Sequence, residues 1–112
     1  MQKEGTVMCY FLIDTYVDSE KDRSSYDAYI RRVKPVVEKY GGRYLLRSEN
    51  ITPLSETRTP QRVIIIHFPD QEHLERCFAS AEYQDIKFLR ESTVDARALI
   101  VREEEYCEST SD

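Results

Sequence analysis

The sequence predicts an α+β fold in which four strands and two helical regions follow one another in the order βαββαβ. Three observations support this prediction: segments rich in β-branched and aromatic residues, two stretches with the apolar spacing of amphipathic helices, and the pair Gly41-Gly42 between the first helical stretch and the second strand. Glycine adopts positive φ without steric cost, so the pair fits a helix end followed by a tight entry into a strand. This order is typical of a ferredoxin-like fold, an antiparallel four-stranded sheet with its helices on one face.

The first strand is predicted over residues 7–17, and both of its faces are apolar. The helix that follows is expected to begin at Ser24, a residue type that can cap it, and to end at the glycine pair. One apolar stripe with helical spacing runs along it: Tyr26, Tyr29, Ile30, Val33, Val36, Val37 and Tyr40. Because proline removes a backbone donor and clashes with the preceding turn, Pro35 predicts a kink or a break between two helical pieces.

The second strand is predicted over residues 43–48. Strict alternation gives it two faces, Tyr44 and Leu46 on one, and Arg43, Leu45 and Arg47 on the other. A loop over 49–61 leads to the third strand over 62–68. Four consecutive β-branched residues, 63–66, make the third strand the most buried-looking segment, so we expect it to be central in the sheet.

The second helical region is expected to begin at Pro69-Asp70 and to consist of two pieces. Two apolar stripes mark these pieces: Leu74, Cys77, Phe78 and Ala81, then Tyr83, Ile86 and Leu89. The last strand is predicted over residues 95–102. The two helical regions can cover only one face of the sheet, whereas the first and third strands are apolar on both faces. We therefore expect a second copy of the chain to cover the other face, sheet against sheet, in a homodimer.

The length of 112 residues suits one domain, which we place at 1–102, followed by an acidic tail at 103–112. The tail carries four Glu and one Asp without Lys or Arg; of the 21 acidic residues, 16 remain in the body and balance its 16 basic ones. A neutral body argues against a nucleic-acid partner. The tail is expected to be disordered, with partner binding as the alternative. No apolar run reaches the ~20 residues of a membrane helix, so we expect no membrane contact and a cytoplasmic location.

The three cysteines are odd in number and widely spaced, which fits neither a disulfide framework nor a zinc motif. Cys9 and Cys77 lie in apolar patterns and are interpreted as small buried side chains, whereas Cys107 in the tail is the thiol expected to react with oxidants. The sequence contains no phosphate loop, Ser-His-Asp set or dinucleotide fingerprint, and its two histidines form no metal motif. No cofactor and no metal are therefore predicted.

Several residue groups resemble one family: Tyr40-Gly41-Gly42-Arg43-Tyr44-Leu45, the strand Val63-Ile64-Ile65-Ile66-His67-Phe68-Pro69, the segment Ser80-Ala81-Glu82-Tyr83, and Arg90. From about Met8 to Arg102 their spacing is similar to that of the family called domain of unknown function 1330. The resemblance implies a ferredoxin-like protomer that pairs into a dimeric α/β barrel, an architecture shared with small monooxygenase-like proteins, and it implies no established activity. The chain departs from the family pattern with Thr57 after Glu56, His67 before Phe-Pro, and Phe78 where tryptophan is common.

Six residues are candidates for binding a ligand: Tyr29, Arg43, Arg47, His67, Tyr83 and Arg90. The tyrosines, together with Tyr26, are placed to line a pocket between helices and sheet, and arginine suits a carboxylate or phosphate. His67 is a weak candidate for a general acid or base, because histidine changes charge near neutral pH. It is expected at the opposite rim of the sheet from Asp14, so the two form no dyad.

Each candidate also has a structural interpretation. The tyrosines can belong to the core, and His67 can be a hydrogen-bonded residue at the rim of the sheet. The arginines can pair with Glu38, Glu56 or Asp95, or lie across the dimer interface.

Three functions remain open at this point. The chain is predicted to be a small homodimer that binds an organic ligand between sheet and helices. The first alternative is a cofactor-independent enzyme, monooxygenase-like or isomerase-like, acting on a small aromatic or carbonyl compound; only the fold analogy supports it. The second alternative is a structural or regulatory dimer without a ligand.

Overall fold

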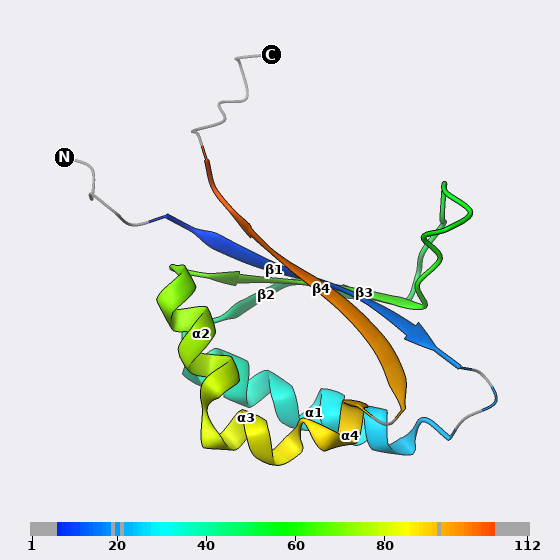
Figure 1. The fold of residues 1–112 in the computed structure, drawn as a ribbon, viewed down its shortest axis with the longest axis horizontal. Helices are drawn as coiled ribbons and strands as arrows, with labels where there is room; N and C mark the ends of the chain where they lie inside the picture. Colours follow the sequence, from blue (N-terminus) through cyan, green and yellow to red (C-terminus); the bar gives the residue numbers. More distant parts are fainter. Residues whose placement is uncertain (1–6, 19, 21, 92, 105–112) are drawn as a thin grey trace.

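The sheet of the computed structural model, which describes residues 7–18, 20, 22–91 and 93–104, has the strand order β2-β3-β1-β4 with every neighbouring pair antiparallel. Its strands are β1 (Cys9–Val17), β2 (Arg43–Ser48), β3 (Arg62–Phe68) and β4 (Val94–Arg102). The helices all lie on one side of this sheet (Figure 1). The ferredoxin-like order and the central position of β3 are therefore confirmed.

The helical layer consists of α1 (Ser24–Lys39), α2 (Gln71–Ala79), α3 (Ala81–Ile86) and α4 (Phe88–Glu91). The second helical region thus has three pieces where two were predicted. Its first division falls at Ser80, whose extended backbone ends α2 and whose hydroxyl accepts the Tyr83 backbone N–H at 3.1 Å to begin α3. Asp70 caps α2 in the same way, through the His73 N–H at 2.9 Å. No helix in the described part of the chain is both long and apolar enough to cross a membrane.

Two details of α1 differ from the prediction. The helix runs without a break through Pro35, so the predicted division into two pieces is wrong. Proline costs a helix about 3 kcal/mol, and the burial of Val33 and Val37 on either side of it offsets that cost. Ser24 does not cap the helix: it is the first helical residue, and its own backbone N–H is bound by the Asp22 carboxylate at 3.0 Å.

The pair Gly41-Gly42 forms the helix end predicted for it. Gly41 has φ of +92°, and its N–H donates to the Glu38 carbonyl at 3.1 Å. The N–H of Gly42 donates to the Val37 carbonyl at 2.9 Å. These two bonds define a Schellman motif, which satisfies the last carbonyls of α1 and turns the chain into β2.

The faces of β2 differ from strict alternation because of a bulge. Tyr44 lies opposite Ile66, whereas Leu46 lies opposite Ile65, so the register shifts at Leu45. A bulge places one extra residue in one strand and reverses the alternation beyond it. The prediction that Tyr44 and Leu46 share a face is therefore wrong.

The same shift separates the two arginines of β2. Arg43 lies opposite His67, on the side away from the helices, whereas Arg47 lies opposite the buried Ile64, on the side of the helices. The prediction that Arg43 and Arg47 share one face is wrong for this reason. No single ligand on one side of the sheet can contact both.

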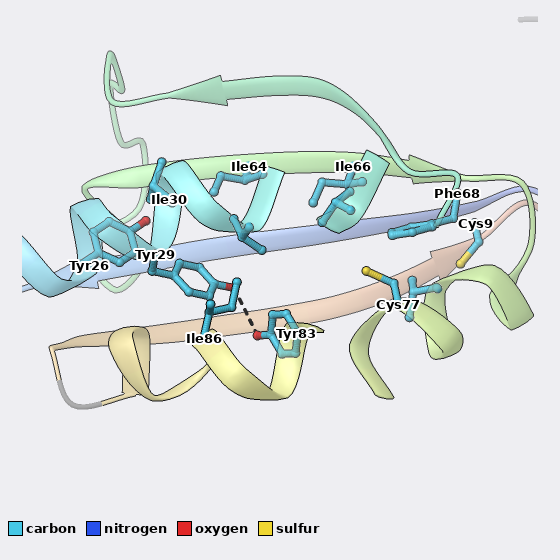
Figure 2. Packing of buried hydrophobic residues seen from close by; sticks show 13 residues of the cluster. Cys9, Tyr26, Tyr29, Ile30, Ile64, Ile66, Phe68, Cys77, Tyr83 and Ile86 are labelled. Atoms are coloured by element: carbon cyan, nitrogen blue, oxygen red, sulfur yellow. Dashed lines mark hydrogen bonds between the residues drawn. The ribbon is translucent and has the colours of Figure 1, made fainter. Parts of the chain in front are cut away.

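The core lies between the sheet and the helical layer (Figure 2). It includes Cys9 and Cys77, both fully buried free thiols, which confirms their interpretation as small core side chains. Burial raises the pKa of Cys77 to about 11, so this thiol stays protonated at neutral pH and is a poor nucleophile. Cys107 lies outside the described residues.

The outer face of the sheet, the side away from the helices, carries an apolar row across all four strands. The row consists of Leu46, Ile65, Leu12 and Leu99. Leu46 is 45% exposed and Leu99 59% exposed, so this row is open in the single chain. The sheet is thus apolar on both sides while its helices cover one, as the sequence predicted. Of the acidic tail, residues 105–112 lie outside the described residues, and the domain boundary at residue 102 stays a prediction.

Replacing Gly42 with alanine is expected to destabilise the fold. A Cβ atom there would lie 2.5 Å from Val37 Cγ1 and 2.9 Å from Phe68 Cε1, two fully buried side chains that cannot move away cheaply. Such overpacking costs about 1–3 kcal/mol in the free energy of unfolding, measurable by urea denaturation.

Gly41→Asn is the matched control, because asparagine tolerates positive φ and the nearest atom belongs to the half-exposed His73 ring at 3.2 Å. Equal losses for the two variants would contradict the packing role given to Gly42.

Candidate functional site

A cavity of about 170 Å³ lies between the sheet and the helices. Its apolar wall includes Phe11, Ile13, Val33, Ile64, Ile66 and Phe78. Its polar wall consists of Thr15, Tyr26, Tyr29, Tyr44, Tyr83 and Arg90. On the β4 side the wall is formed by Ala96 and Ala98, whose small side chains leave the space open. A dry cavity of about 150 Å³ accommodates one benzene ring, so this one has room for a single aromatic ring.

A connected polar group stands at one wall of the cavity. The hydroxyls of Tyr29 and Tyr83 are 3.1 Å apart, and Arg90 Nη2 donates to the Tyr83 hydroxyl at 3.2 Å. The Arg90 guanidinium carbon also lies 5.8 Å from the centre of the Tyr29 ring. The three side chains come from α1, α3 and α4, and Figure 2 shows the two tyrosines meeting across the helical layer.

The electrostatics of this group favour a neutral phenol beside a permanent cation. Burial, together with the neighbouring Tyr83, raises the pKa of Tyr29, so its hydroxyl keeps its proton at neutral pH. Burial alone would lower the pKa of Arg90. The two neighbouring tyrosine hydroxyls raise it by more than burial lowers it, so the pKa lies above its usual value and the guanidinium stays charged. Arg90 forms no ion pair with any carboxylate of the described residues. The cavity wall therefore holds a positive charge without a counter-ion from the described part of the chain.

Tyr26 is a second polar point on the wall. It is 1% exposed, and within the described residues its hydroxyl makes no hydrogen bond of normal geometry. Burial raises its pKa, and the nearby Thr15 hydroxyl lowers it in part. The ring itself is held by Arg23 and Arg62, whose guanidinium carbons lie 5.8 and 5.7 Å from its centre and which both bind Glu49.

The structure brings together half of the six predicted ligand-binding candidates. Tyr29, Tyr83 and Arg90 form the polar group of the cavity, as described above. Arg47 lies on the same side of the sheet, with its guanidinium carbon 5.4 Å from the centre of the Tyr44 ring, but it does not line the cavity.

The other two candidates lie on the outer face of the sheet. His67 is paired there with Arg43 and packs edge-on against Tyr10, with ring centres 5.5 Å apart. Asp14 lies four register positions along β1 from Tyr10, the partner of His67, and is bound by Arg58 at 2.6 and 3.0 Å. Asp14 and His67 therefore lie toward opposite ends of the sheet, as the strand directions predicted.

Two of the three carboxylates suggested as partners of the candidate arginines bind elsewhere. Asp95 binds Arg97 at 2.8 Å and Glu38 lies 3.9 Å from Lys34. The second histidine, His73, lies on α2 and is bound to Asp70 at 2.7 Å.

Sequence reasoning did not assign Thr15, Tyr44, Ala96 or Ala98 to the cavity, nor most of its apolar wall. The alternation of β4 carries a usable signal, because Ala96 and Ala98 are small residues at a spacing of two, with the charged Asp95 and Arg97 on the opposite face. They lie opposite Thr15 and Ile13 on the helix side of the sheet. Among the described residues, no three His, Cys, Asp or Glu side chains are grouped as metal ligands.

Comparison with known proteins assigns the chain to a class. The fold and cavity define a ferredoxin-like α+β protein, and the model of the family described as domain of unknown function (DUF1330) matches residues 10–104. The chain belongs to this family, as the resemblance in its sequence predicted. No curated protein matches it.

Solved structures of distant relatives share the fold. A protein of unknown function from Rhodopseudomonas palustris superimposes with a TM-score of 0.75 at 18% identity, covering 91% of this chain and 88% of that one. SnoaB, a cofactor-independent oxygenase from Streptomyces nogalater, gives 0.61 at 10% identity, with 95% and 99% covered. A dimeric ferredoxin-like protein of unknown function from Thermobifida fusca gives 0.64 at 6% identity, with 90% and 95% covered.

Removing the hydroxyl of Tyr83 and removing that of Tyr26 are expected to change the stability of the fold by different amounts. Tyr83→Phe should lower the free energy of unfolding by about 1–2 kcal/mol, because Tyr29 and Arg90 both lose a partner. Tyr26→Phe should change it by less than about 0.5 kcal/mol, or stabilise the fold, because an unpaired buried hydroxyl is lost. Urea denaturation of both variants at pH 7 measures the difference, and a larger loss for Tyr26→Phe would refute this assignment of hydrogen bonds.

Proposed function

We propose that the chain is a small cytoplasmic homodimer that binds an organic molecule in the cavity between its sheet and its helices. The observation that carries this proposal is the cavity itself: a space the size of one ring, with an apolar wall and a convergent polar group. Ligand sites are typically apolar hollows with a few placed polar groups. The buried free thiols of Cys9 and Cys77 favour a reducing compartment such as the cytoplasm.

Binding is better supported than catalysis. The predicted acid–base candidate, His67, lies on the outer face of the sheet and does not line the cavity. The titratable groups that do line it are tyrosines and Arg90, none of which is a good proton carrier near neutral pH. The oxygenase SnoaB shares the fold at 10% identity, and a shared fold does not carry a shared reaction.

The dimer is supported by the outer face of the sheet. Its central row of four apolar side chains crosses every strand, and Leu46 and Leu99 in that row are substantially exposed in the single chain. A contiguous apolar surface of this kind marks an interface, and a second copy presents the same surface. The Thermobifida fusca protein with this fold is dimeric.

Leu99→Glu is expected to dissociate the dimer, because a carboxylate at the β4 end of the apolar row would be buried in the interface without a partner. Light scattering after size exclusion at micromolar concentration should give twice the chain mass for the native protein and the chain mass for the variant.

Leu54→Glu is the matched control, since Leu54 is 98% exposed in the loop between β2 and β3 and should leave the dimer intact. A native protein that is monomeric at this concentration would refute the homodimer and leave the cavity proposal standing.

A neutral one-ring compound, benzyl alcohol, is expected to bind in the cavity. Amide chemical shifts should change around Val33, Ile64 and Tyr83 when millimolar benzyl alcohol is added. Ala96→Leu should abolish these changes by filling the space, whereas Ala79→Leu, at an exposed position of α2, should not. Unchanged spectra for the native protein with benzyl alcohol, benzamide and benzoate alike would refute a ligand-binding cavity and favour the structural alternative, a dimer without a ligand.

A further inference from the structure

We propose that the ligand of the cavity is an anion, a single-ring aromatic carboxylate, whose carboxylate is bound by Arg90 and the adjoining tyrosine hydroxyl. This inference rests on the proposed function, since it names the chemical class that the same cavity takes. Three properties of the wall lead to it: its surplus of hydrogen-bond donors, its unpaired charge and the shape of the space.

The polar group of the cavity has more donors than acceptors. Tyr29 and Tyr83 each carry one hydroxyl proton, and the bond between their oxygens uses only one of the two. Arg90 donates to Tyr83 and has further N–H groups, and a guanidinium accepts nothing. One phenol proton and several guanidinium protons are therefore left to bind an acceptor, so this group favours a ligand rich in acceptors over one rich in donors.

The charge of the wall selects among acceptors. Arg90 is partly buried, and none of the described carboxylates pairs with it. A buried charge is costly unless it is paired, and a carboxylate pairs with guanidinium through two parallel hydrogen bonds. An anionic ligand thus gains an ion pair that a neutral isostere of the same size does not.

The remaining wall fits the body of the ligand. Phe11, Ile13 and Val33 supply flat apolar surface, and Phe78 stands edge-on to Tyr83, with ring centres 4.8 Å apart. A space of about 170 Å³ holds one ring with a small substituent and leaves no room for a second ring. A carboxylate is also a better fit than a phosphoryl group at this group, since Tyr29, Tyr83 and Arg90 together offer one arginine and one free hydroxyl proton.

The test compares benzoate with benzamide, its neutral isostere, by isothermal titration of the native protein at pH 7. We expect benzoate to bind at least tenfold more tightly, and its affinity to fall as the salt concentration rises. Equal affinities would overturn the proposal of an anionic ligand and leave the ligand-binding cavity intact. If neither compound binds and benzyl alcohol causes no change in amide chemical shifts, the cavity proposal is overturned as well.

Variants locate the effect at Arg90. Arg90→Gln should weaken benzoate binding at least tenfold and change benzamide binding less than twofold, and Arg90→Lys should restore part of the benzoate affinity through its charge. Arg76→Gln, an exposed arginine of α2 paired with Glu72, is the control that should leave both affinities unchanged. Equal weakening by Arg76→Gln would show a non-specific charge effect and overturn the assignment. If Arg90→Gln fails to fold, the comparison of the two compounds on the native protein decides the question alone.

Discussion

The close approach of α1 to the sheet is the constraint on which the rest of the structure depends. At Gly42 there is no room for a side chain between Val37 of α1 and Phe68 of β3, so the helix end and the strand lie as near as backbone packing allows. The Schellman bonds hold the turn at that point. With this end of α1 fixed, the buried side chains of the helix meet the sheet and α3, and Tyr29 reaches Tyr83. The helical layer and the sheet are held close together at Gly42, whereas the small residues Ala96 and Ala98 of β4 leave space near α4. The cavity lies in that space.

The sheet divides the polar chemistry of the chain into two separate surfaces. The cavity side holds phenols and a guanidinium, whereas the outer face holds His67 with Arg43, and Asp14 with Arg58. No residue of one surface can assist a reaction at the other, because the sheet itself lies between them. The outer groups therefore lie with the apolar row proposed as a dimer interface, and the inner groups lie at the cavity proposed to bind a ligand.

Much of the fold could be predicted from periodicity, because spacing reports directly which residues share a face of a helix or strand. The apolar stripe of α1 placed Tyr26 and Tyr29 correctly, and the β-branched run placed β3 at the centre. The faces of β2 could not be predicted, because a bulge arises from pairing with β3 and leaves no mark on spacing. The contact of Arg90 with Tyr83 is equally hidden, since it depends on the division between α3 and α4 at Lys87. The sequence suggested arginine as a ligand-binding residue type, but it could not say which arginine faces the cavity.

The end of the second helical region and the strand β4 that follows it together form part of the cavity wall. The Thr93 hydroxyl donates to the carbonyls of Leu89 and Arg90 at 3.0 and 3.2 Å, which fastens the end of α4 just before β4 begins. One short stretch of chain thus supplies both the charge of the cavity at Arg90 and its free space at Ala96 and Ala98. Substitutions confined to this stretch would therefore change both the volume and the charge of the cavity, while α1, the glycine turn and the three other strands keep their packing.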